Sequence, residues 1–259
     1  MSDDMGGGEA GTMDDLHELD EFEDALIDRF KRHPVLADVT RLADEDFAEI
    51  LLQRRFLSLA FTPAYDLAID LLEDEAGLRI ARVILREEYP DDSGHTRSHR
   101  EDMTEDLIRL GVPRKEIVES TPTAATTAAI TDTLGLIADA GRQGSPDLRL
   151  LTFLRFWGEV LVSVEYELLW PRMEPVLIQN GENRSRFYYP HYVHDAKARS
   201  LATVSLLSGT HSDRLGMRVS ELLAREDGAE CFREIEEGAL RLKETFYDQF
   251  RPMVPVPES

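Results

Sequence analysis

The chain has 259 residues and a formal net charge of −22 at pH 7, and its hydrophobic residues, 42% of the total, come in short runs. This length suits one domain around one core, and a charge this negative disfavours nucleic-acid partners because it would repel phosphate groups. No apolar run approaches the ~18 residues of a membrane span, and the N-terminus lacks the pattern of a secretory signal, so we expect a cytoplasmic protein without a membrane partner.

Helical spacing of apolar residues predominates along the chain, which predicts an all-α fold. Residues 1–13 are rich in Gly and Asp without periodicity and are predicted to form a disordered tail before one domain over 14–259. Prolines mark the ends of the periodic segments. The predicted helices are 14–32, 37–60, 63–73, 76–89, 98–110, 123–140, 147–179, 187–208, 213–225 and 229–250.

Two consecutive predicted helices carry polar residues at their facing ends. The first ends in Glu87 and Glu88, and periodicity leaves open which acid faces the core. The second begins at Ser98 and Glu101, which fit the S-x-x-E capping box. His99 then lies in the first turn, on the apolar side, whereas His95 lies in the loop before the cap and is the weaker candidate. Because the positive end of the helix dipole disfavours an imidazolium, we expect His99 to be neutral and available as a ligand.

The longest predicted helix carries an acid on its apolar face. Large apolar residues recur at three-and-four spacing over 153–164, and the next position on that stripe is Glu167. An ionised carboxylate in an apolar interior is costly without a partner. We therefore expect Glu167 to point inward and bind a cation, and Glu159 and Glu165 to face solvent or neighbouring helices.

The segment PHYVHDAKARS places His191 and Asp195 four residues apart, on one helix face. Taken alone, this pattern is more typical of a core histidine paired with an acid. Inward-facing ligand residues in several helices instead favour one shared metal site, which gives each of them a partner. Since Cys231 is the single cysteine, the metal would be held by nitrogen and oxygen, which suits iron or manganese.

These segments together resemble the heme-oxygenase-like dimetal oxidases and oxygenases, also described as iron-containing redox enzymes. REEYPDDSGHTRSHREDMTEDLIRLG is similar to the family's Glu-then-His segment, EYELLWP to its Tyr-x-Tyr-Glu-x-x-x-Pro helix, and FYYPHYVHDAK to its H-x-x-x-D-x-x-H helix. The resemblance implies a single-domain heme-oxygenase-like bundle of about seven core helices. It also implies the metal ligands Glu88, His99, Glu167, His191 and Asp195.

One position departs from the family pattern, which has a further His three residues after the Asp. This chain has Ala198 there, and His194, one turn away, is the candidate replacement. Arg199, one turn after Asp195, is a candidate for binding a substrate carboxylate. The tyrosines 166, 188 and 189 are expected to pack rather than to bind substrate.

The resemblance implies two Fe(II) per chain, O2 as cosubstrate, and oxidation of a small amino-acid-like substrate in specialised metabolism, by N-oxygenation, desaturation or carbon–carbon cleavage. A homodimer is expected for an enzyme of this kind. Three alternatives stay open: a heme-binding member of the fold that uses His33 or His99, a cofactor-free member of the thiaminase II or pyrroloquinoline-quinone synthase type, and a non-catalytic acidic interaction module.

Overall fold

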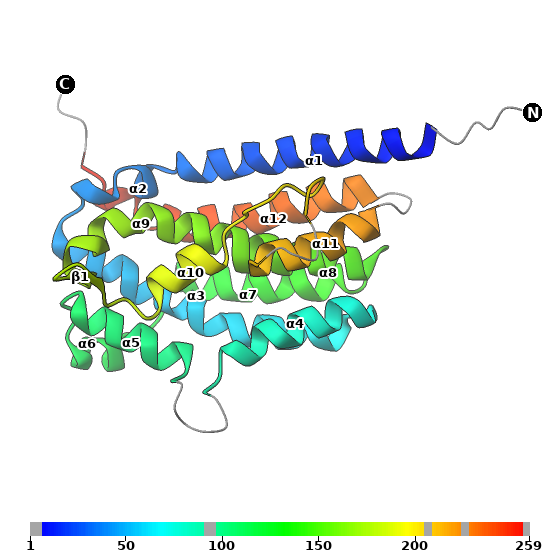
Figure 1. The fold of residues 1–259 in the computed structure, drawn as a ribbon. Helices are drawn as coiled ribbons and strands as arrows, with labels where there is room; N and C mark the ends of the chain where they lie inside the picture. The colour runs from blue at the N-terminus through cyan, green and yellow to red at the C-terminus, as the bar shows by residue number, and fades with distance from the viewer. Residues whose placement is uncertain (1–6, 91–96, 205–208, 224–227, 256–259) are drawn as a thin grey trace, which may run out of the picture.

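The structure is a computed structural model that describes residues 7–90, 97–204, 209–223 and 228–255. Within these ranges it is all-α, as predicted, apart from a hairpin of β1, Ile178–Gln179, and β2, Glu182–Asn183 (Figure 1). The helices are α1 Gly7–Lys31, α2 Pro34–Ala37, α3 Asp44–Leu71, α4 Glu75–Glu87, α5 His99–Arg109, α6 Arg114–Glu119, α7 Ala124–Ala140, α8 Pro146–Phe153, α9 Leu161–Leu177, α10 Tyr188–His194, α11 His211–Leu223 and α12 Gly228–Asp248.

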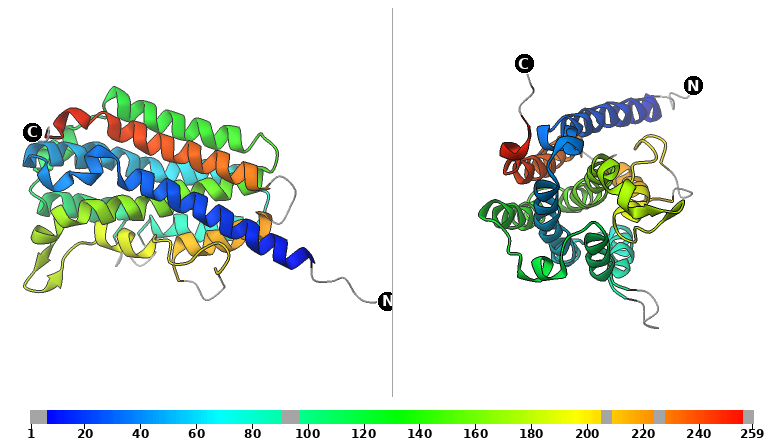
Figure 2. Two further views of the ribbon diagram at one scale, coloured as in Figure 1. Left: turned by 90° about the horizontal axis from the view of Figure 1, so that it is seen from above. Right: turned by 90° about the vertical axis from the view of Figure 1, so that its left-hand side faces the viewer.

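The long helices run side by side in one elongated bundle (Figures 1 and 2). Its central element is the segment from α8 to α9, in which residues 154–160 form a π-helix between the two α-helices. Every residue from 148 to 166 is buried, so this segment has no solvent-facing side over that length. A helix buried all round must be covered by neighbours on every side, and α1, α3, α10, α11 and α12 all pack against it.

Several predicted boundaries are wrong. The first helix begins at Gly7 rather than at residue 14, although Gly7, Gly8 and Gly11 are poor helix formers. α3 begins at Asp44 rather than at residue 37. α3 continues through Pro63, where the sequence predicts a break. Pro63 removes one backbone hydrogen bond, and the burial of Ala60 and Ala64 beside it holds the helix together.

The end of α10 also differs from the prediction, and this difference affects the site. α10 ends at His194 instead of continuing to residue 208. Side-chain carboxylates replace the helical hydrogen bonds beyond this point. Asp20 accepts hydrogen bonds from the backbone N–H groups of Leu201 and Ala202, at 2.7 and 3.2 Å. Asp213 accepts one from the N–H of Arg199 at 3.2 Å. The chain after α10 therefore crosses to α11 as an irregular connection.

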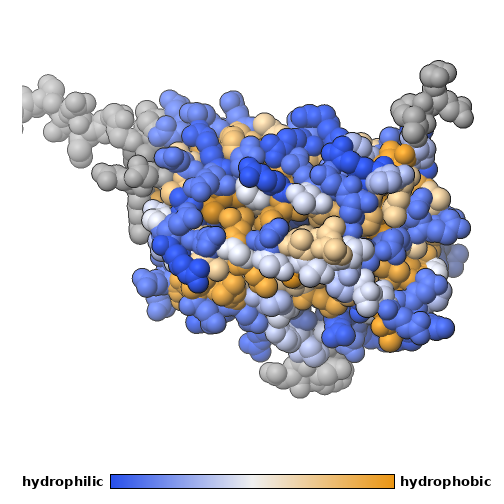
Figure 3. All heavy atoms as spheres, turned by 180° about the vertical axis from the view of Figure 1, so that it is seen from behind, coloured by the Kyte–Doolittle hydropathy of each residue, from blue (hydrophilic) through white to orange (hydrophobic). Residues whose placement is uncertain are grey.

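The surface matches the acidic composition, because hydrophilic side chains cover most of the face seen from behind, with hydrophobic ones in a band across its middle (Figure 3). Among the described residues, none of the helices has the length and apolar character to cross a bilayer.

Candidate metal centre

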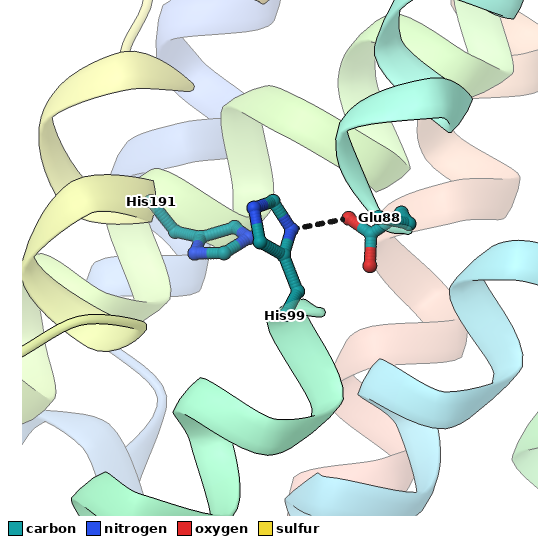
Figure 4. A group of neighbouring side chains, drawn as sticks. All are labelled: Glu88, His99 and His191. Carbon is teal, nitrogen blue, oxygen red and sulfur yellow. Dashed lines mark hydrogen bonds and ion pairs between the residues drawn. The ribbon is translucent and has the colours of Figure 1, made fainter. Parts of the chain in front are cut away.

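Glu88, His99 and His191 form the first group of potential metal ligands, with donor atoms all within 4.8 Å of one another. They come from the C-terminal end of α4, the first residue of α5 and the middle of α10, and their side chains point toward one another (Figure 4). Glu88 Oε1 lies 2.8 Å from His99 Nδ1. Burial lowers the pKa of His99, but the hydrogen bond to Glu88 and the charge of Glu88 outweigh it and raise that pKa, so the expectation that the helix start keeps His99 neutral is wrong for the protein alone. The capping box predicted at the start of α5 is present, with its Ser98 and Glu101 bonds in both directions, and it places His99 at this corner.

His191 is held in the form that a metal needs. Its Nδ1 lies 2.6 Å from the backbone carbonyl of Phe187, which can only accept, so Nδ1 carries the proton and Nε2 carries a lone pair. Burial, followed by the charge of His99, lowers the pKa of His191 to about 3. The ring is therefore neutral at physiological pH, and its second nitrogen is fixed by a partner outside the group, as is usual for metal-binding histidines.

The second group consists of Glu159, Asp195 and His211, whose donor atoms also lie within 4.8 Å of one another. Glu159 comes from the π-helix, Asp195 from the end of α10 and His211 from the first residue of α11. His211 Nδ1 is 3.4 Å from Glu159 Oε2 and 3.5 Å from Asp195 Oδ1. Tyr65, fully buried, donates a hydrogen bond to Glu159 and so orients its carboxylate.

The two carboxylates of the second group, Glu159 and Asp195, would be stabilised by a bound cation. Burial would lower the pKa of His211, but hydrogen bonds to Asp195 and Glu159 outweigh it and raise that pKa to about 10. Burial and the nearby charge of Glu159 raise the pKa of Asp195 well above its usual range. Two buried carboxylates this close are stable when one of them is protonated or when a positive charge lies between them. In the protein alone, the imidazolium of His211 supplies that charge.

The two groups face one cavity, which is lined by His99 and His191 from the first and by Glu159, Asp195 and His211 from the second. Together they offer three carboxylates and three imidazoles without a thiolate. Nitrogen and oxygen donors in this proportion, projecting inward from several helices, fit a pair of iron or manganese ions. The residues present therefore suit a dinuclear centre, with three protein ligands for each ion.

Glu167, the remaining predicted ligand, is not part of either group. Its side chain is 45% exposed and its carboxylate lies 3.2 Å from Lys31 Nζ, so the expectation that it points inward is wrong. The reason is the π-helix, whose i→i+5 hydrogen bonds turn the chain less per residue than an α-helix does. Residues after Val160 are thereby rotated off the stripe that leads to Glu167. Glu159, which the sequence places on another face, is buried instead.

Glu165 is fully buried and pairs with Arg54 of α3 and Lys243 of α12, so of the two alternatives predicted for it the contact with neighbouring helices is confirmed and the solvent-facing position is wrong. Arg199 is exposed, outside the helix on which its prediction depended, and does not line either cavity at the site. Tyr166 and Tyr188 are buried in the core, whereas Tyr189 is 39% exposed and packs on Trp170. His95, a weaker candidate in the sequence, lies outside the described residues.

His211 belongs to the second ligand group, which neither Ala198 nor His194 joins. Because α10 ends at His194, Ala198 is exposed and no longer on the face of His191 and Asp195. His194 is also exposed and lines the cavity without joining either group. The sequence does contain a signal for His211, since it follows Thr210 as His99 follows Ser98, at the start of a helix and two residues before an acid.

No protein-family model and no curated protein sequence matches the chain. Solved structures do. A domain of unknown function with a heme oxygenase-like fold from Shewanella denitrificans aligns over 91% of both chains, with a TM-score of 0.66 and 16% sequence identity. A CADD-like protein of unknown function from Nostoc punctiforme aligns over 92% of this chain and 100% of its own, with a TM-score of 0.64 and 11% identity.

A TenA family transcription regulator from Silicibacter aligns over 98% of this chain and 100% of its own, with a TM-score of 0.53 and 15% identity. The chain has the heme-oxygenase-like fold. At these identities the likeness concerns the fold alone, and what the site does must be argued from its own residues.

Proposed function

We propose that this chain is a non-heme diiron oxidase or oxygenase that uses O2 to oxidise a small amino-acid-like substrate. The observation that carries the proposal is the pair of ligand groups around one cavity, each with at least one imidazole and one carboxylate within 4.8 Å. Glu88, His99 and His191 would hold one iron and Glu159, Asp195 and His211 the other. When bound, two Fe(II) ions supply the electrons and the open coordination positions that O2 activation requires.

The protein's own residues prepare this site in three ways. The carbonyl of Phe187 fixes the tautomer of His191, and Tyr65 fixes the carboxylate of Glu159. Phe61 lines the cavity beside both groups. The imidazolium of His211 can give up its proton when a metal ion takes over the neutralisation of Glu159 and Asp195.

The alternatives account for less of the site. A heme bound by a single histidine leaves the acids of the second group without a role. His33, one candidate for that histidine, is 4% exposed and its Nε2 is 3.1 Å from Asp248 Oδ1, so it already has a partner. A non-catalytic module has no need for two sets of inward-pointing acids and histidines, which are costly to bury.

Anaerobic loading with Fe(II), followed by removal of free metal and elemental analysis, tests the proposal. We expect two irons per chain in the wild type and one in each of the variants His99→Ala and His211→Ala. Oxygen uptake by the loaded wild type, measured with an electrode, should exceed that of either variant. A wild type that retains no iron, or that instead gives a strong Soret band with heme, would overturn the proposal.

A further inference from the structure

A second cavity lies beside the first ligand group and contains charges that the metal centre does not use. It has about 380 Å³ of empty space, part of it open to solvent, and its wall includes Glu88 and His191. Most of the remaining wall is apolar, from side chains such as Leu57, Trp157 and Phe187. Two cations, Arg54 and Lys243, also line it.

Arg54 and Lys243 share a single carboxylate, that of Glu165. Arg54 Nε donates to Glu165 Oε1 at 2.6 Å, and Lys243 Nζ donates to Oε2 at 3.2 Å. Tyr247 adds a hydrogen bond to Glu165 but no charge. All three charged side chains are at most 4% exposed. The cluster of Arg54, Lys243 and Glu165 therefore carries a net charge of +1 in the interior of the protein.

Both cations retain donors that no described residue satisfies. Arg54 Nη1 donates to Ser58 Oγ at 2.8 Å, whereas Nη2 makes no hydrogen bond within the described part of the chain. Lys243 has three N–H groups, of which Glu165 accepts one. Burial lowers the pKa of Lys243 to about 8, so the amine is still cationic at neutral pH.

Neutralising Glu165 does not explain the second cation. Arg54 alone already forms a short, charge-assisted bond to Glu165, and a further buried ammonium costs free energy unless it meets another anion. Glu88, an acid that lines this cavity, is already hydrogen-bonded to His99 at 2.8 Å and belongs to the first ligand group. The anion that completes the cluster is therefore missing from the chain itself.

We propose that Arg54 and Lys243 bind the carboxylate of a small molecule in this cavity, with the apolar body of that molecule extending past Trp157 and Phe61 toward Glu88 and His191. That the bound molecule is the substrate rests on the proposed function. That a carboxylate binds between Arg54 and Lys243 does not depend on it. The substrate class is then a short carboxylic acid with an apolar body, and its carboxylate is bound here rather than by the exposed Arg199.

Calorimetric titration of the metal-free full-length chain at pH 7 tests this, because without iron a carboxylate cannot be bound by the metal. The probes are matched pairs that differ only in charge: hexanoate with hexanamide, and leucine with leucinamide. We expect at least one acid to bind about tenfold or more tightly than its amide. Lys243→Met should abolish that preference. The double variant Lys243→Met with Glu165→Gln should regain part of it, because it restores the excess positive charge.

Lys197→Met is the matched control, since Lys197 is also held by acids but does not line this cavity. It should keep the preference, and circular dichroism should verify that every variant is folded. Equal binding of acid and amide by the wild type, or a preference that survives in Lys243→Met, overturns the inference. Two irons per chain without acid preference would remove this inference alone, and acid preference without iron binding would remove the proposed function alone.

Discussion

Two glutamates on the central helical segment, Glu159 and Glu167, allow a sharp test of how the π-helix builds the metal centre. Glu159 is 1% exposed and lies in the second ligand group, whereas the Glu167 side chain is 45% exposed and pairs with Lys31. Replacing each by Gln removes one negative charge and leaves the volume almost unchanged. The two variants therefore differ in position and not in chemistry.

The expected effects differ by orders of magnitude. Glu167→Gln loses a partly exposed ion pair worth about 0–1 kcal/mol and should retain two irons. Glu159→Gln loses one of the three ligands in its group. Residues one step removed from a metal already contribute about 10–100-fold to affinity, so the loss of a ligand should weaken the second iron by at least about 100-fold, or about 3 kcal/mol.

Equilibrium dialysis against buffered Fe(II) under anaerobic conditions, with elemental analysis of the protein, measures both affinities. Thermal unfolding in the presence of EDTA shows whether each variant folds without metal. The reasoning fails if Glu159→Gln keeps two tightly bound irons, or if Glu167→Gln loses one while Glu159→Gln does not. The second result would return the ligand role to Glu167, the residue that the sequence pattern selects.

Three further outcomes are expected. His194→Ala should keep two irons, measured as above, because the side chain is exposed and outside both ligand groups, in contrast to His211→Ala. Glu236→Gln should raise the free energy of unfolding at pH 8 but not at pH 4, measured by urea titration. Burial and the charge of Glu23 raise the pKa of Glu236 well above 4.5. The contribution of Glu236 to stability is therefore full below pH 4.5 and is lost as the pH rises. Glu23→Gln should cost up to about 3–5 kcal/mol at pH 7 in the same assay, since it removes the carboxylate that binds the buried guanidinium of Arg155 most closely and leaves it Glu236, at 3.5 Å.

The parts of this site that could be predicted from the sequence are those set by local rules. A capping box starts a helix wherever it occurs, and so the start of α5 and the placement of His99 follow from Ser98 and Glu101. Periodicity cannot choose between Glu87 and Glu88, because both acids lie where the chain leaves the helix. The structure places Glu88 against His99, at 2.8 Å, and Glu87 against His211, at 3.2 Å.

The parts that could not be predicted depend on helix phase and tertiary contacts. Apolar spacing assumes a constant turn per residue, and the π-helix over 154–160 breaks that assumption within a stretch that is buried throughout. The end of α10 at His194 is set by carboxylates distant in sequence, from Asp20 and Asp213. Helix propensity does not contain that information.

The two histidines that begin helices show how the same local device serves both halves of the centre. His99 follows Ser98 and His211 follows Thr210, and in each case the hydroxyl accepts a hydrogen bond from the N–H of the third residue on, Glu101 at 3.3 Å and Asp213 at 3.2 Å. A cap fixes the backbone of the next residue and hence the direction of its side chain. Each imidazole is thus held by its own helix start, so the ligands are set by the backbone rather than by the metal. The second capped histidine thereby joins Glu159 and Asp195, so each of the two ligand groups contains one histidine that is placed by a cap.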